Sequence, residues 1–133
     1  MATQDDIDFV RKNPIEEIVT TYPELKIKGY VISGFKNGIL FGVGGVVPCN
    51  NFGEVWIILT KYAKEFPVTA YLTIKREIVK IANKYKFKYL RCIIREDFVK
   101  GKEMVEHLGF FYKNKILNCM PDGTDGYLYE MIL

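Results

Sequence analysis

Residues 54–94 decide the fold, and they contain EVWIILT (54–60), TAYLTIKREIVKIANKY (69–85) and YLRCII (89–94). The first and third segments are short apolar runs, typical of buried strands, and the first is apolar on both faces, as in a central strand. In the middle segment, apolar residues recur at helical spacing, which predicts a helix. A strand, a helix and a strand in this order predict a right-handed crossover and a locally parallel pair of strands.

The chain before this unit contains two helix signals. Residues 4–12 carry acidic residues where the first turn of a short helix is expected, and these complement the helix dipole. A second short helix is expected between Pro14, which suits a first helical position, and Pro23, which ends the element.

A hairpin signal follows these helices. Residues 30–35 and 39–47 are β-rich runs joined by Asn37-Gly38, a strong turn signal. No helix comes after the glycines of the second run, so they indicate a bulge or twist in a long strand rather than a nucleotide-binding loop (Gly42, Gly44 and Gly45).

The last part of the chain adds one helix and two strands. A helix is predicted over residues 98–108, with Gly109 as its left-handed stop, and strands are predicted over residues 110–117 and 127–133. We therefore predict a single domain over residues 1–133 of the α/β class (α+β, mixed sheet), with about six strands flanked by about four helices.

Composition narrows the class of protein. The 133 residues are 49% hydrophobic, enough for the core of one domain. The polar beginning has no signal-peptide pattern, and no apolar run approaches the roughly 20 residues that span a bilayer. We therefore expect a soluble, cytoplasmic protein.

The three cysteines (Cys49, Cys92 and Cys119) lack paired spacing, so we expect reduced thiols and no metal site.

The net charge of +3 is unevenly distributed, because residues 1–60, 61–115 and 116–133 carry −2, +8 and −3. One interpretation is that the basic middle segment faces an anionic partner, such as a nucleotide cofactor. The alternative is that its basic residues face water, because they alternate with apolar residues as in amphipathic elements. The charge is low for a nucleic-acid-binding protein and no motif of that class is present, so nucleic acid is not an expected partner.

The last helix ends in Glu106-His107-Leu108-Gly109-Phe110. Together with the strand–helix–strand unit before it, this ending resembles the E-K-L-G-F ending of the last helix in the GNAT (N-acetyltransferase-like) superfamily. The likeness is strongest over residues 54–112 and implies a GNAT-like fold. A narrower likeness is to small GNAT-like proteins that phages encode near their structural genes, some described as internal virion proteins. For such a protein the location would be the host cytoplasm or the virion.

The resemblance also implies a cofactor, acetyl-CoA, whose pyrophosphate sits at a helix N-terminus on backbone amides of a glycine-rich R/Q-x-x-G-x-G/A loop. The corresponding loop here, residues 66–71, reads Phe-Pro-Val-Thr-Ala-Tyr and has no glycine or arginine. We expect Thr69 to cap the long helix and leave amides free for an anion, although the side chains of Val68 and Tyr71 would crowd the site. The cofactor contacts implied by the resemblance lie at the end of the central strand and the start of the long helix: Leu59, Thr60, Val68, Thr69, Ala70 and Tyr71.

Glu54, at the beginning of the central strand, is the candidate general base by its position in the resemblance; the alternative is a solvated strand end. The family's helix tyrosine, which often protonates the departing thiolate, is replaced by Val105, which cannot donate a proton. His107 is the single histidine and is either a general base or a surface residue. Trp56, in the middle of a central strand, is interpreted as a core residue.

Two functions stay open. The first is an acyl-CoA-dependent N-acetyltransferase with a non-standard pyrophosphate loop. The second is a catalytically inactive GNAT-like phage structural or protein-binding component, which explains the altered loop and Val105 directly. The expected partners are a CoA ligand in the first case and a protein in the second. Neither the acceptor substrate nor the oligomeric state follows from the sequence.

Overall fold

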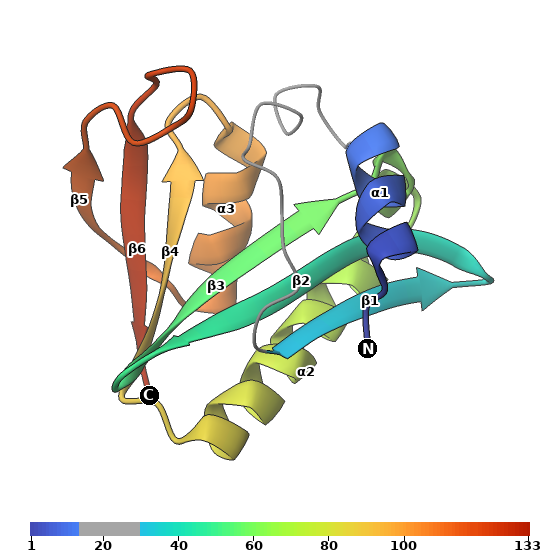
Figure 1. The fold of residues 1–133 in the computed structure, drawn as a ribbon, viewed down its shortest axis with the longest axis horizontal. Helices are drawn as coiled ribbons and strands as arrows, with labels where there is room; N and C mark the ends of the chain where they lie inside the picture. Colours follow the sequence, from blue (N-terminus) through green and yellow to red (C-terminus); the bar gives the residue numbers. More distant parts are fainter. Residues whose placement is uncertain (14–29) are drawn as a thin grey trace.

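The computed structural model describes residues 1–13 and 30–133. The described strands form one sheet in the order β1-β2-β3-β4-β6-β5 (Figure 1). The strands are β1 (Tyr30–Lys36), β2 (Ile39–Cys49), β3 (Phe52–Leu59), β4 (Tyr89–Arg95), β5 (Phe111–Ile116) and β6 (Gly126–Ile132). The helices are α1 (Gln4–Lys12), α2 (Pro67–Tyr85), α3 (Val99–Leu108) and the short 3₁₀ helix η2 (Lys61–Glu65). The helix predicted between Pro14 and Pro23 lies outside the described residues.

The predicted hairpin is confirmed. Strands β1 and β2 turn at Asn37 and Gly38, whose φ angles of 53° and 76° are both left-handed, as a two-residue hairpin turn requires. The pairing register shifts near this turn: Gly34 of β1 faces Gly42, whereas the next residue of β1 faces Leu40. Strand β2 therefore has one extra, unpaired residue between these two positions. This extra residue forms a bulge in β2, as the glycines of that strand indicated.

The predicted crossover is also confirmed, with β3 and β4 parallel and α2 between them. Helix α2 begins at Pro67, two residues before the predicted start, with proline in the first turn, where its missing N–H costs no hydrogen bond. The N-cap residue is Phe66, which makes no side-chain cap. The prediction that Thr69 caps this helix is therefore wrong, because Thr69 lies inside the first turn.

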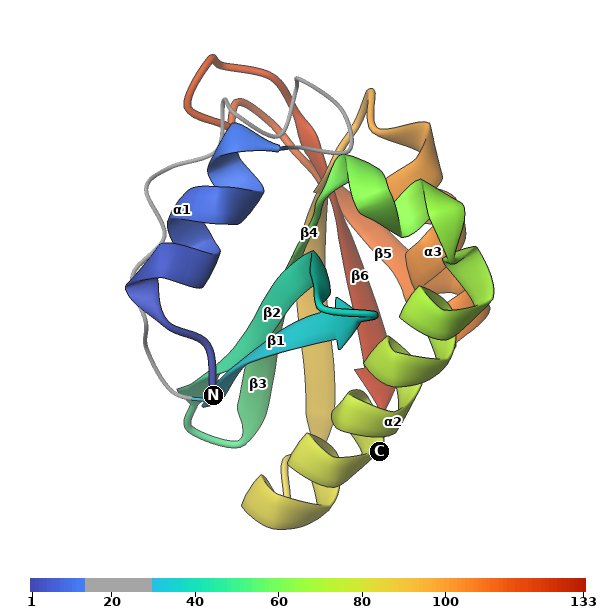
Figure 2. The ribbon, with the colours of Figure 1, turned by 90° about the vertical axis from the view of Figure 1, so that its right-hand side faces the viewer.

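The helices cover both faces of the sheet. Figure 2 shows α1 on one face and α2 and α3 on the opposite face. The main core lies between α2, α3 and the central strands, where α2 contributes Ile78 and Ile81, α3 contributes Val105 and Leu108, and β4 contributes Leu90. The mixed, six-stranded α/β architecture agrees with the predicted fold class. No helix among the described residues is long and apolar enough to cross a membrane.

The end of α3 is built as the sequence predicts. Gly109 has a φ of 106°, a left-handed conformation that glycine adopts without strain, and the Phe110 amide donates to the Val105 carbonyl at 3.0 Å. Leu108 is buried beneath the sheet. The chain then enters β5, the edge strand that pairs antiparallel with β6.

Candidate functional site

The two parallel strands in the middle of the sheet separate soon after they meet. Strands β3 and β4 pair at only three positions, from Phe52 opposite Tyr89 to Glu54 opposite Arg91. Beyond Glu54 the strands diverge toward their carboxyl ends (Figure 1). The separated part of β3 pairs with β2 on its other side, and that of β4 pairs with β6. Two strand edges thus face each other without a strand between them.

Open strand edges carry backbone N–H and C=O groups that need hydrogen-bond partners. An extended ligand with amide groups satisfies such edges in the way an added strand does. The separation of β3 and β4 therefore leaves two facing strand edges whose shape and backbone groups match those of an extended, amide-bearing molecule.

A cavity of about 160 Å³ lies in this separation. Its walls come from β3, β4 and the inner face of α3, and almost all of them are apolar. Gly101 of α3 lies against the ring of Phe98, the N-cap residue of the same helix, and an added Cβ would be 2.5 Å from that ring. The wall residues include Trp56, Ile58, Ile94, Phe98, Met104 and Val105.

Glu54, the predicted catalytic residue, lies at the narrow end of the cavity. Its carboxylate pairs with Arg91 Nη2 at 3.3 Å, and its side chain is 37% exposed. The Arg91 guanidinium also lies 4.5 Å from the ring centroid of Phe52, and its buried Nε has no acceptor among the described residues. The ion pair fixes the Glu54 carboxylate at the point where the strands begin to separate.

Cys92 is the second titratable side chain in the wall of this cavity. Burial first, and then the negative charge of Glu54, raise the pKa of the Cys92 thiol to about 12. The thiol is therefore protonated at neutral pH and is a poor nucleophile, since the thiolate is the reactive form.

Among the predicted cofactor residues, Leu59 lines the cavity and Thr60 does not. Thr60 is fully buried. Its hydroxyl donates to the Leu40 carbonyl at 2.9 Å and accepts from the Tyr62 amide at 3.3 Å. Its own amide and carbonyl also have backbone partners. Thr60 therefore holds the turn after β3 and leaves no free polar group for a ligand.

The start of α2 is exposed and carries a nearby cation. Val68 is 68% exposed, so its side chain points to solvent. Lys36 of β1 donates from Nζ to Thr69 Oγ1 at 3.0 Å, and the same ammonium group lies 5.8 Å from the ring centroid of Phe66. A positive charge is thus present where the loop lacks arginine.

The remaining predicted residues lie farther from the cavity. Ala70 is buried in the helix, and the Tyr71 hydroxyl donates to the His107 carbonyl at 2.9 Å, which joins α2 to the end of α3. His107 is exposed and its Nδ1 lies 2.8 Å from the Glu103 carbonyl, within α3.

Val105, in contrast, faces the cavity, so the wall has valine where the resemblance implies a tyrosine. Trp56 is half-buried and lines the cavity instead of filling the core.

The sequence analysis did not assign Arg91, Cys92 or Gly101 to the site. A lone arginine inside the apolar run of β4 was a usable signal, because a charged residue in such a strand needs a partner. Gly101 was another, because glycine inside a helix costs about 1 kcal/mol relative to alanine and indicates close packing. Nothing in the sequence brings Cys92 to Glu54.

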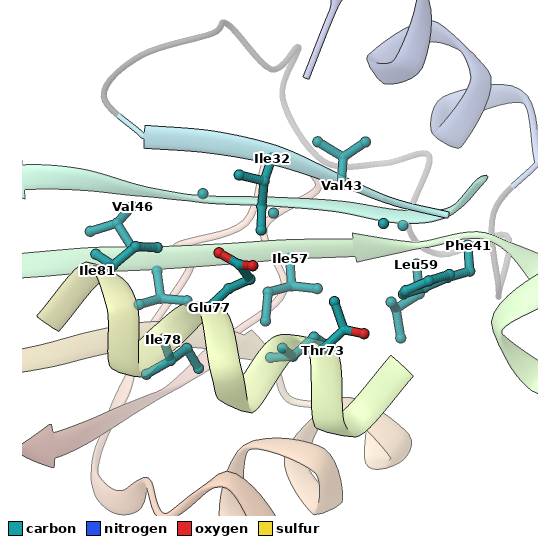
Figure 3. Close-up of a pocket in the computed structure, with 16 residues that line it drawn as sticks. Ile32, Phe41, Val43, Val46, Ile57, Leu59, Thr73, Glu77, Ile78 and Ile81 are labelled. Atoms are coloured by element: carbon teal, nitrogen blue, oxygen red, sulfur yellow. The ribbon is translucent and has the colours of Figure 1, made fainter. Parts of the chain in front are cut away.

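A second hollow lies between α2 and strands β1–β3 (Figure 3). Figure 3 shows the Glu77 carboxylate pointing from α2 toward the strands, near Ile32 and Ile57. The Tyr30 hydroxyl donates to Glu77 Oε2 at 3.5 Å. The cavity volume is about 50 Å³, room for a few water molecules, so this hollow is too small for an organic cofactor.

No family model and no curated protein matches the sequence. Solved structures match the fold. Ribosomal-protein-alanine N-acetyltransferase from Brucella melitensis has a TM-score of 0.66 at 15% identity, over 77% of this chain and 68% of that one. IAA acetyltransferase from Bacillus cereus has a TM-score of 0.68 at 16% identity, over 89% and 85%. An acetyltransferase of the GNAT family from Streptococcus pneumoniae has a TM-score of 0.68 at 14% identity, over 77% and 65%.

These similarities establish the fold, which is that of the GNAT acetyltransferases. Identities of 14–16% carry no assignment of substrate or activity. The chain spans about two thirds of the length of the first and third of these proteins. Across the described residues, no group of three or more histidine, cysteine, aspartate or glutamate side chains is arranged to hold a metal ion.

Proposed function

We propose that this protein is an N-acyltransferase that uses acetyl-CoA or a related acyl-CoA. The observation that carries the proposal is the separation of β3 and β4 after three paired residues, with an apolar cavity between two open strand edges. The GNAT fold of the structural neighbours supports it. The bound acyl-CoA would supply a reactive thioester.

Two different parts of the protein would hold the pantetheine arm and the pyrophosphate of such a cofactor. The pantetheine arm is extended and carries amides, so it suits the facing edges of β3 and β4 and the apolar wall. The pyrophosphate would lie at the start of α2, since the first amides of a helix and its dipole favour an anion. Lys36 supplies a positive charge there through its contact with Thr69. This arrangement is a non-standard pyrophosphate site because the glycine-rich loop is absent.

Glu54 is the proposed general base. It is the only carboxylate in the described wall of the cavity, and it accepts the proton that the attacking amine loses. The ion pair with Arg91 orients this carboxylate. The departing thiolate would take its proton from solvent, because Val105 has no donor and the pKa of Cys92, about 12, makes its thiol a weak acid.

The second candidate is a catalytically inactive phage structural or protein-binding component. The observation in its favour is the same wall, which contains no hydroxyl or imidazole group among the described residues. A protein that keeps the fold for binding alone needs neither a proton donor nor a phosphate cradle.

The test is the thermal midpoint of the purified chain with and without millimolar acetyl-CoA, with ADP and ATP as controls. We expect a rise of several degrees specific to acetyl-CoA, since a ligand at about 100 times its Kd stabilises by about 2.7 kcal/mol. The Cys92→Phe variant, which fills the cavity, should lose the shift. The matched Cys92→Val variant should keep it. No shift in the native chain would reject the acyltransferase.

A further inference from the structure

Three tyrosines gather on the C-terminal hairpin. Tyr112 of β5 pairs with Tyr129 of β6, and Tyr127 lies two residues before Tyr129 on the same face of β6. The Tyr112 ring is nearly perpendicular to both others, with centroid distances of 5.6 Å to Tyr127 and 6.1 Å to Tyr129. Tyr112 is 53% exposed, so part of this aromatic surface is open to solvent.

The outer face of α3 forms the other wall of a groove beside these rings. It contributes Lys102, Glu103 and Glu106, which lie on one side of the helix by their spacing. The groove has a volume of about 410 Å³. The residues of α3 that line the β3–β4 cavity are different ones, on the inner face. The tyrosine groove is therefore a separate place, divided from the proposed acyl-transfer site by the helix itself.

The charges in the groove are arranged for a cation. Lys102 Nζ lies 4.8 Å from the ring centroid of Tyr127, so the groove already holds an ammonium group of its own chain. Glu103 and Glu106 form no ion pair within the described residues. Glu106 accepts a hydrogen bond from the Tyr129 hydroxyl at 3.1 Å, which fixes its carboxylate beside the rings.

We propose that the tyrosine groove binds the primary ammonium group of an alkylamine, which takes the place of Lys102 Nζ at the ring of Tyr127. The faces of tyrosine rings attract cations within about 6 Å. The two carboxylates accept N–H donors that the ammonium group brings. The two carboxylates repel an anion, and a neutral alkyl chain gains no electrostatic attraction from the groove.

The hydroxyl of Tyr129 supports this arrangement. Burial first, and then its hydrogen bond to Glu106, raise the pKa of Tyr129 to about 12. It therefore stays a neutral donor at the pH of any ordinary binding measurement and holds Glu106 in place. The proposal does not depend on acyl transfer, because none of these residues lines the β3–β4 cavity.

The test is a titration of the full chain with n-butylammonium chloride at constant ionic strength, with the tyrosine ring resonances followed by NMR. We expect saturable shifts confined to Tyr112, Tyr127 and Tyr129. Tyr127→Leu removes the ring of the proposed contact and should weaken binding by about 2- to 5-fold, the value of one exposed cation–π contact. Lys102→Gln should tighten it by a similar factor, because the internal competitor is gone.

Two matched variants and one matched ligand complete the design. Phe111→Leu changes an exposed ring next to Tyr112 outside the groove, and Lys100→Gln removes a charge from α3 outside it; both should bind as the native chain does. The neutral n-butanol should not shift the three rings. Equal shifts with n-butanol, absence of saturation, or equal tightening by Lys100→Gln and Lys102→Gln would overturn the proposal. Failure of acetyl-CoA binding would leave it unaffected.

Discussion

Glu54 and Arg91 face each other at the last paired position of β3 and β4, and Arg91 Nη2 lies 3.3 Å from Glu54 Oε2. The ion pair therefore lies where the two strands begin to diverge. On one side the backbones are hydrogen-bonded, and on the other an apolar cavity begins. This position gives the Glu54 carboxylate access to the cavity while Arg91 restricts its movement.

The Glu54→Gln variant tests the proposed general base. We expect the rate of acetyl transfer to amines to fall by about 10²- to 10⁴-fold, because glutamine keeps the shape but accepts no proton. Acetyl-CoA affinity and the thermal midpoint should change little. The measurement is thiol release from acetyl-CoA at saturating amine. The matched Glu65→Gln variant, on an exposed carboxylate of η2, should keep the native rate; an unchanged rate in Glu54→Gln would exclude this role.

The Val105→Tyr variant tests the missing proton donor. Val105 faces the cavity, so a tyrosine there presents its hydroxyl to the departing thiolate. We expect a kcat at least about tenfold above that of Val105→Phe, which adds the same ring without the hydroxyl. The comparison is made on steady-state rates after both variants are shown to fold by their thermal midpoints. Equal kcat values would mean that proton supply to the thiolate does not limit the reaction.

The Lys36→Gln variant tests the start of α2 as an anion site. Lys36 Nζ contacts Thr69 in the first turn of the helix, so its loss removes the positive charge proposed to meet the pyrophosphate. We expect acetyl-CoA affinity to fall by about 5- to 10-fold, as for one charge-assisted contact of about 1 kcal/mol. Isothermal titration calorimetry measures this. Lys88→Gln, an exposed lysine beyond the other end of α2, is the control, and an equal loss there would indicate a general charge effect.

Acid stability tests the cluster around Arg95. The buried Arg95 side chain pairs with Asp122 and Asp97 and binds Thr124. The hydrogen bond from Arg95 first, and then those from Thr124, hold the pKa of Asp122 well below its ordinary value. A lowered folded-state pKa adds stability above the unfolded-state pKa of about 3.9, and this stability is lost as the pH falls through the folded-state pKa.

We therefore expect the difference in unfolding free energy between the native chain and Asp122→Asn to be constant above about pH 5 and to shrink below about pH 4. Urea unfolding at a series of pH values measures it. Glu65→Gln, on the exposed carboxylate of η2, is the control for the loss of one surface negative charge. A difference that does not vary between pH 3 and pH 7 would contradict the ion pair.

Much of the fold follows from the sequence because its signals are local. The Asn37-Gly38 turn, the crossover around the long helix and the stop at Gly109 each depend on neighbouring residues, and each is confirmed. The prediction for the start of α2 also used a local signal, but it was wrong. Thr69 is a good cap by residue type, but Pro67 already fixes a helical φ and begins the helix two residues earlier.

The candidate site is mostly a product of the tertiary structure. The resemblance indicated Glu54 by its place at the beginning of the central strand, but the sequence could not show where β3 and β4 stop pairing. That point depends on how the twisted sheet packs against α2 and α3, which involves residues far apart in the chain. The pairing of Glu54 with Arg91, the place of Cys92 in the cavity wall and the tyrosine groove all follow from that packing. Local patterns thus determined which elements form, and long-range packing alone decided which side chains meet.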